Sequence, residues 1–178
     1  MDGEGPPASA AAYPPGVLGE QLGAAQRGDT LAMNDLMELL APFVSRICGP
    51  IALSHAADAA QEALTVVFRR LPTLRDPAAL HGWVRAIAIR EAVRVAQRYV
   101  TLTVAEFPDL PSPGDIESAS DIRDVLARMP PEHRAVLVLR DLEGLSEHEA
   151  AAVLAVPRGT VKSRLHRARR GFREAWIR

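Results

Sequence analysis

The segment 145–172 constrains the fold most, because it predicts two short helices separated by a sharp break. Ser146 and Glu149 have the spacing of a capping box, in which a hydroxyl and a carboxylate cap the first helical turn reciprocally. Residues 155–157 (Ala-Val-Pro) then end that helix, since proline cannot continue the helical hydrogen-bond pattern. A second helix begins near Arg158, so the sequence predicts a helix-turn-helix.

The second of these helices has one apolar and one basic face. Its core stripe recurs at helical spacing and consists of Val161, Leu165, Ala168 and Phe172. The opposite face carries Ser163, His166, Arg167 and Arg170, flanked by Thr160 and Lys162. Such a face is typical of a recognition helix, whose first residues meet base edges while later arginines neutralise phosphates. A solvated surface helix can show the same charge pattern, so that alternative stays open.

The net charge of −1 conceals two basic blocks. The last 23 residues carry eight basic side chains and one acidic one, and residues 63–100 carry seven and two. Residues 1–62 and 101–129 are acidic instead. Two separate basic blocks are expected where two patches of one chain meet a polyanion.

The rest of the sequence predicts an all-α fold of two small helical domains. Residues 1–16 are mostly Pro, Ala and Gly and predict a disordered tail, because they bury too little apolar surface. Residues 17–100 form the first helical domain, and residues 101–118 form an acidic, proline-rich linker. Residues 119–178 form the second domain with the helix-turn-helix. No alternating strand pattern is present.

Local signals place the helices of the first domain. Helical spacing of leucines begins at Leu31, and Pro42 predicts a break in that helix or the start of a new one. A second helix is expected over residues 56–71. A third is expected to start at Asp76-Pro77, where an N-cap acceptor precedes proline at the first helical position, and to continue to Arg98.

Several classes of protein are excluded or disfavoured. No apolar run approaches the roughly 18 residues of a membrane span, and there is no secretory signal pattern, so we expect a cytoplasmic protein. The single Cys48 is expected to be a small buried residue. No catalytic or cofactor motif is present, and Glu147-His148-Glu149 is better explained by the helix dipole than by metal binding. We therefore expect no enzyme, no cofactor and no metal.

Residues 125–146 and 156–169 closely resemble the fourth region of bacterial extracytoplasmic-function (ECF) sigma factors. In that family this region binds the promoter −35 element. The resemblance implies −35 contacts by Arg158, Thr160, Lys162, Ser163, Arg164 and Arg167, to which the helical wheel adds His166 and Arg170. The wheel turns Arg164 partly toward the core stripe, which suits a backbone phosphate better than a base.

The first domain resembles the second region of the same family. Asp58-Ala-Ala-Gln-Glu62, followed by Val66-Val-Phe68, is similar to the surface that docks on the clamp helices of the polymerase largest subunit. The wheel puts a polar stripe opposite the apolar one on this helix, although an ordinary solvated face would look the same. The expected polymerase contacts are Asp58, Gln61, Glu62, Thr65 and Arg69.

The segment 83–88 (Trp-Val-Arg-Ala-Ile-Ala) is similar to the family's Trp-x-x-x-Ile-Ala core, which meets the −10 element. An aromatic ring beside guanidinium groups suits single-stranded DNA, which needs a stacking surface and phosphate neutralisation. A lone helical tryptophan can equally belong to the core. The expected −10 contacts are His81, Trp83, Arg90, Arg94, Gln97 and Arg98.

The chain departs from the family pattern at two positions. Arg90 stands where the family usually has Asn, and Arg94 stands where Asp is common. Both changes add positive charge, so no rule for which −10 base is read carries over. The acidic linker resembles one that threads the polymerase interior, although a plain tether has the same composition.

The resemblance implies a non-catalytic sigma factor that binds bacterial core RNA polymerase and promoter DNA. Many members of that family are held inactive by an anti-sigma factor, although no residue of this sequence identifies one. Two alternatives stay open. A stand-alone helix-turn-helix regulator would be a dimer on a palindrome. An interaction module that has lost promoter activity is suggested by Arg90 and Arg94.

Overall fold

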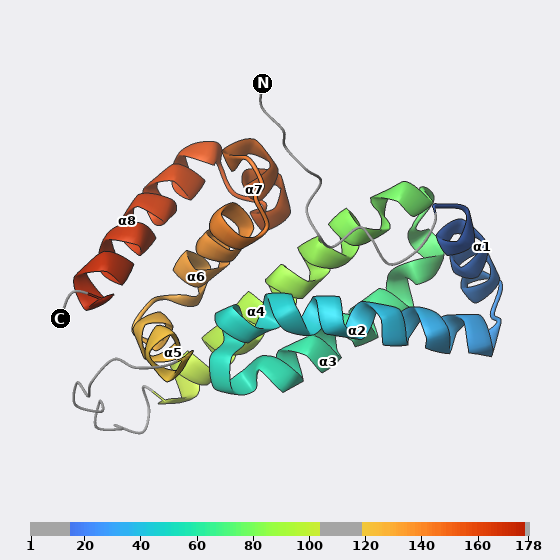
Figure 1. The fold of residues 1–178 in the computed structure, drawn as a ribbon, viewed down its shortest axis with the longest axis horizontal. Coiled ribbons are helices and arrows are strands. Elements are labelled where there is room, and N and C mark those ends of the chain that lie inside the picture. The colour runs from blue at the N-terminus through green and yellow to red at the C-terminus, as the bar shows by residue number, and fades with distance from the viewer. Residues whose placement is uncertain (1–14, 104–118, 177–178) are drawn as a thin grey trace.

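The computed structural model describes residues 15–103 and 119–176, and over these residues it contains helices and no strand (Figure 1). The predicted all-α fold is therefore confirmed. The helices are α1 (Pro15–Gln26), α2 (Thr30–Ala52), α3 (Ala56–Arg70), α4 (Leu80–Thr103), α5 (Ala119–Ala127), α6 (Pro131–Leu137), α7 (Glu147–Leu154) and α8 (Arg158–Trp176).

Helices α2, α3 and α4 lie side by side and form the first helical group, with α1 at one end (Figure 1). Their shared core consists of fully buried aliphatic side chains, among them Leu36, Val44, Val67 and Ile89. Helix α3 runs over almost the whole predicted range of 56–71, because its apolar residues recur at helical spacing and face α2 and α4. Cys48 is buried in this core, as predicted.

The predicted break at Pro42 is wrong. Helix α2 continues through both Pro42 and Pro50 to Ala52. Proline removes one backbone donor and therefore leaves one carbonyl of the preceding turn without its helical partner. Pro42 is exposed, so water can satisfy that carbonyl, and the buried residues on the other face hold the helix together.

The two predicted irregular segments fall largely outside the described residues, which leave out 1–14 and 104–118. Helix α1 begins at Pro15, inside the range predicted for the tail, and α4 ends at Thr103, inside the range predicted for the linker. The Asp76 carboxylate accepts from the Ala78 amide at 2.9 Å, as predicted for an N-cap. The turn that it caps, Pro77–Ala79, is a 3-10 helix that leads into α4.

The predicted helix-turn-helix is confirmed in α7 and α8. The Glu149 amide donates to Oγ of Ser146 at 3.2 Å, and the Ser146 amide donates to the Glu149 carboxylate at 2.7 Å. Ala155 caps the C-terminal end of α7, and its φ of 53° and ψ of 44° are left-handed. The core stripe of α8 faces α6 and α7, and Val161, Leu165 and Ala168 are buried.

The second helical group, which consists of α5 to α8, packs directly on the first, with α6 against α2 and α4 (Figure 1). The buried side chains of both groups form one continuous apolar cluster. Glu143, in the loop between α6 and α7, is 4% exposed and accepts from Arg46 of α2 at 2.6 Å and from Arg85 of α4 at 2.9 Å. The two groups are thus joined by an apolar contact and a partly buried ion-pair cluster.

The segment Thr30–Thr73 contains a stretch long and apolar enough to cross a membrane by length and composition alone, whereas the sequence predicts no span. In the fold Leu36, Leu40 and Ile47 of this segment are buried in the core that α2 shares with α3 and α4, whereas Leu31 at its start is exposed. That placement is the one expected for the core helix of a helical bundle.

Candidate nucleic-acid and polymerase interfaces

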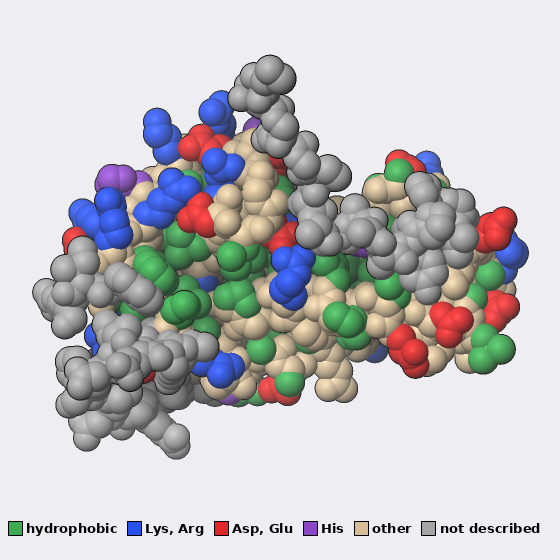
Figure 2. Space-filling model, in the orientation of Figure 1, with side chains coloured by type: hydrophobic (Ala, Val, Ile, Leu, Met, Phe, Trp, Pro, Cys, Tyr) green, Lys and Arg blue, Asp and Glu red, His purple; other side chains and the backbone are tan. Residues whose placement is uncertain are grey.

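Helix α8 lies beyond α6 as seen from α2 and α4 (Figure 1), and most of its basic side chains are exposed. Figure 2 shows Lys and Arg side chains gathered at this end of the molecule, while Asp and Glu gather at the opposite end, around α1 and the start of α2. Five of the eight predicted −35 residues are exposed, namely Arg158, Lys162, His166, Arg167 and Arg170. The other three are half-buried, namely Thr160, Ser163 and Arg164.

The first turns of α8 are tied to the rest of the helix-turn-helix. Arg158 pairs with Glu147 of α7 at 3.2 Å, and Oγ of Ser163 donates to the Thr160 carbonyl at 3.0 Å. Arg170 lies 3.6 Å from Glu174, an exposed pair of the kind that contributes little. The contacts of Arg158 and Ser163 fix the start of the helix. Arg167, which lies about one helical turn before Arg170, has no ion pair among the described residues.

The positive potential of α8 reaches α6. Burial lowers the pKa of His133 in α6, and the nearby guanidinium groups of Arg167 and Arg164 lower it further, while Glu132 acts in the opposite direction.

Arg134, on the same helix, is 4% exposed and donates to the carbonyls of Leu126 and Met129 at 3.0 Å each. Burial lowers the pKa of Arg134 to about 10.

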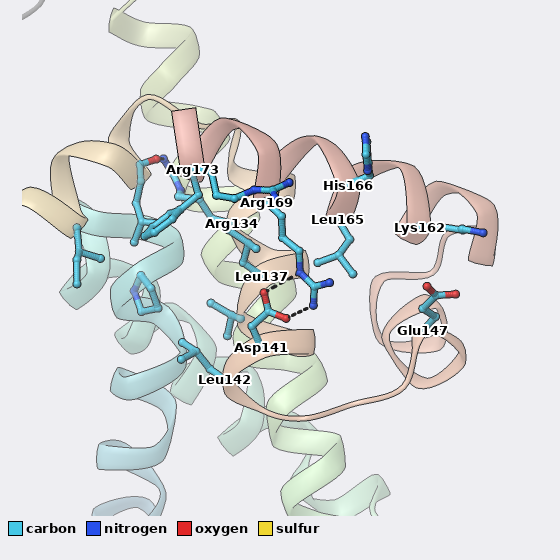
Figure 3. Close-up of a pocket in the computed structure, with 15 residues that line it drawn as sticks. Arg134, Leu137, Asp141, Leu142, Glu147, Lys162, Leu165, His166, Arg169 and Arg173 are labelled. Carbon is cyan, nitrogen blue, oxygen red and sulfur yellow. Dashed lines mark hydrogen bonds and ion pairs between the residues drawn. The ribbon is translucent and has the colours of Figure 1, made fainter. Parts of the chain in front are cut away.

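A groove of about 790 Å³ lies under α8, between it, α5 and the end of α6 (Figure 3). Leu165 points into it, and Lys162 and His166 line its edge with their terminal groups directed outward (Figure 3). Arg169 reaches down to Asp141 and donates to its carboxylate at 2.5 and 3.2 Å. This ion pair was missed from the sequence, because it joins helices 28 positions apart.

The predicted −10 residues at the start of α4 are less exposed to solvent than those at its end. Trp83 is half-buried and packs against the apolar core, so the alternative of a core tryptophan is partly realised. His81 contacts the Phe43 ring edge-on with 5.6 Å between ring centroids. Burial, and then the charge of Arg85, lower the pKa of His81.

The predicted −10 residues at the end of α4 are exposed, but they have protein partners. Gln97 donates to Glu132 of α6, which joins the two helical groups. Arg94 donates to Glu91 of its own helix and to Glu62 of α3, and Arg98 donates to the same Glu62 carboxylate at 3.2 and 3.3 Å. Arg90 differs, since Nε of Arg90 donates at 2.9 Å to the Ala86 carbonyl of its own helix.

The predicted polymerase-binding residues form one stripe on α3. The structure brings together all five, since Asp58, Gln61, Glu62, Thr65 and Arg69 line one shallow cavity of about 340 Å³ with Val66. The same cavity is lined by Arg94 and Tyr99 of α4. Tyr99 donates to the Asp58 carboxylate at 3.3 Å and stacks on His55 with 3.4 Å between ring centroids.

The sequence therefore predicted two separate surfaces that the structure joins. The two carboxylates expected to meet polymerase, Asp58 and Glu62, both accept hydrogen bonds from α4, the helix expected to meet DNA. The cations Arg94 and Arg98 hold the pKa of the Glu62 carboxyl below its usual range, with the Arg98 hydrogen bond as the largest cause. No local pattern could have found these pairs, because they depend on how α3 and α4 pack.

Within residues 15–103 and 119–176, no three His, Cys, Asp or Glu side chains are grouped as metal ligands. Glu149 reaches back to the Ser146 amide and so acts as a helix cap. The residues that sequence reasoning missed are Arg46, Arg85 and Glu143, which join the two helical groups.

Residues 119–170 match the family described as Sigma-70, region 4. The chain is 34% identical over 164 residues to the ECF RNA polymerase sigma factor SigE of Mycolicibacterium smegmatis, covering 83% of this chain and 63% of that protein. It is 33% identical over 174 residues to the RNA polymerase sigma-H factor of Pseudomonas aeruginosa, covering 84% of this chain and 89% of that protein.

The fold is similar to that of two solved structures. The sigma factor RpoE of Bartonella quintana, solved in complex with the anti-sigma factor NepR, matches with a TM-score of 0.61 and 22% identity over 81% of this chain and 96% of that one. CnrH in complex with the cytosolic domain of CnrY matches with a TM-score of 0.59 and 20% identity over 89% of this chain and 96% of that one.

Proposed function

Because this chain belongs to the ECF family of RNA polymerase sigma factors, we propose that it directs core polymerase to promoters by holding two DNA elements at once. The single observation that carries the proposal is the placement of two basic surfaces on different helices, α8 and α4. Residues 119–178 would bind the −35 duplex, and residues 17–100 would bind core polymerase and the −10 strand. Holding both elements through one chain makes the second contact intramolecular, so modest affinities suffice.

Helix α8 is proposed to read the −35 element from the major groove. Its exposed residues near the N-terminus, Arg158 and Lys162, and the half-buried Thr160 and Ser163 are positioned for base edges and nearby phosphates. Arg167 and Arg170, further along the exposed face, are positioned for the phosphate backbone. His166 shares this face, and the half-buried Arg164 suits a phosphate at its edge.

Helix α4 is proposed to hold the −10 strand as the duplex opens. The exposed guanidinium groups of Arg90, Arg94 and Arg98 offer phosphate neutralisation along one side of the helix. Trp83 offers the part of its ring that the core leaves exposed, beside His81, as a surface for an unstacked base. Gln97 completes the proposed set.

Helix α3 is proposed to dock on core polymerase. Its stripe is exposed except for the half-buried Glu62, and it offers carboxylates, an amide and a hydroxyl to a partner surface. Two carboxylates one helical turn apart suit a basic partner, because charge complementarity raises both specificity and the association rate.

In this proposal the chain is a non-catalytic subunit that acts in the cytoplasm with core polymerase and promoter DNA as partners. ECF sigma factors are transcription initiation factors, and both similar solved structures were determined with a bound partner protein, named as an anti-sigma factor in one of them. We include a protein of that kind among the proposed partners of this chain.

Run-off transcription tests the proposal. The full chain is added to a sigma-free bacterial core polymerase with genomic fragments as template, and the start sites of the transcripts are mapped. Defined start sites preceded by two shared elements are expected. Transcription that is the same with and without the chain, together with failure to co-purify with core, would contradict it.

A further inference from the structure

The cluster at the α3–α4 contact joins residues that the proposed function assigns to different partners. Glu62, proposed to face polymerase, accepts from Arg94 and Arg98, proposed to face DNA. The same Nη2 of Arg94 also donates to Glu91 at 2.5 Å, so Arg94 is held between two carboxylates. The side chains of Arg94 and Arg98 remain about half exposed, which leaves them open to a competing anion.

This arrangement makes the two partners compete with the same internal ion pairs. A polymerase cation that binds Glu62 must displace the two guanidinium groups, and a DNA phosphate that binds those groups must displace Glu62. The partner that binds first supplies the free energy that breaks the pairs. The second partner then binds a side chain that is already free of its internal partner, so it binds more tightly. Linkage requires each partner to raise the affinity of the other by the same factor.

We infer that Arg94 is a positioning residue that couples polymerase docking to capture of the −10 strand through Glu62. The inference rests on the proposed function, since it assigns polymerase to α3 and DNA to α4. It concerns a residue at which this chain departs from the pattern of the family it resembles, where Asp is common. An Asp at this position would repel Glu62 and could not form the pair.

The pairs are exposed, so the coupling has a bounded size. We expect about two- to five-fold in affinity for the whole set, which corresponds to about 0.4–1 kcal/mol. The pKa of Glu62 is lowered, first by its hydrogen bond from Arg98 and then by Arg94, and the pKa of Arg94 is raised, first by Glu91 and then by Glu62. Both directions agree with charged partners that stabilise each other.

The test measures the dissociation constant of the full chain for bacterial core polymerase, with and without a random-sequence single-stranded oligonucleotide at saturation. Arg94 is argued to hold a phosphate, so the probe needs no particular sequence. The oligonucleotide is expected to tighten polymerase binding of the wild-type chain about two- to five-fold. In R94Q the ratio is expected to fall toward one.

A second readout separates coupling from a structural role. In R94Q, polymerase binding without DNA is expected to become tighter, because Glu62 has lost a competing cation. In E62Q, oligonucleotide binding by the chain without polymerase is expected to become tighter, because Arg94 and Arg98 have lost their acceptor charge. A residue that merely supported the fold would weaken binding in both cases, and R94K is expected to keep part of the coupling.

R90Q is the matched control. Arg90 is an exposed arginine on the same helix, and its one hydrogen bond in the described structure goes to the Ala86 carbonyl. R90Q is expected to weaken oligonucleotide binding and to leave the coupling ratio at the wild-type value. Equal ratios in the wild type and R94Q would overturn the inference while leaving the proposed function standing. Absence of polymerase binding by the wild-type chain would overturn both.

Discussion

Nε of Arg85 lies 2.9 Å from Oε2 of Glu143, which ties α4 of the first helical group to the loop before α7 in the second. Arg85 is 19% exposed and Glu143 is 4% exposed, so the pair is shielded from solvent on both sides. Arg46 of α2 donates to the other oxygen of the same carboxylate. The guanidinium groups of Arg46 and Arg85 also lie 5.5 and 6.0 Å from the centroid of the Phe43 ring.

The first prediction follows from this shielded carboxylate. E143Q keeps the shape of the side chain but leaves Arg85 beside a neutral amide, and an uncompensated, partly buried charge is unfavourable. We expect E143Q to lower the free energy of unfolding by about 1–3 kcal/mol, measured by urea denaturation.

E174Q provides the control for that prediction. It removes the charge of an exposed carboxylate 3.6 Å from Arg170, and exposed pairs contribute at most about 1 kcal/mol. We expect a smaller change than in E143Q. Equal stabilities of E143Q and the wild type would show that the Glu143 contact does not stabilise the packing of the two groups.

The helices were largely predictable from the sequence, because their signals are local. The periodic apolar stripe of α3 and the Ser146–Glu149 capping box lie within a few residues of the groups they organise. Pro42 was misread because the effect of a proline depends on whether its freed carbonyl can reach solvent, which only packing decides. The Arg85–Glu143 pair spans 58 positions and had no local signal at all.

The candidate sites likewise have features that the sequence predicts and features that only the packing of the helices determines. The exposed face of α8 follows from helical periodicity, and its basic side chains lie where the wheel predicts. Arg94 and Glu62 were both identified from the sequence, but for different partners. Their pairing depends on the α3–α4 contact, so it required the structure.

A second prediction concerns the start of the helix-turn-helix. Oγ of Ser146 accepts from the Glu149 amide, and S146A removes that acceptor. Loss of an N-cap acceptor of this kind costs about 0.5–2 kcal/mol, which we expect in the free energy of unfolding by urea denaturation. S45A is the matched control, since Ser45 lies on the exposed side of α2 and alanine suits a helix interior. A loss in S45A as large as in S146A would contradict the capping assignment.

A third prediction concerns pH. Burial and the charges of Arg167 and Arg164 hold the pKa of His133 below its ordinary value in the folded chain. Between the folded pKa and the unfolded value of about 6.5, the unfolded chain binds more protons. Stability is therefore expected to fall as the pH drops below about 6.5 toward the folded pKa, and His81 acts in the same direction.

Urea denaturation at several pH values between about 7.5 and 5.5 measures this effect, because histidine titrates in that range. H133Q cannot titrate at this position, so we expect it to lose less stability on acidification than the wild type. H166Q is the control, because His166 is an exposed histidine on α8. An unchanged pH dependence in H133Q would show that His133 does not sense its cationic neighbours in the folded chain.

The last prediction concerns the basic face of α8. Arg167 is exposed and has no ion pair among the described residues, so it is positioned to neutralise a phosphate when the chain, bound to core polymerase, meets promoter duplex. In R167A we expect weaker binding of duplexes of any sequence and a salt dependence shallower by about one released counterion. R173A is the control, because Arg173 lies on the same helix and lines the groove beneath it. Equal losses in affinity and salt slope in R167A and R173A would show that the outer face of α8 has no special part in binding the duplex.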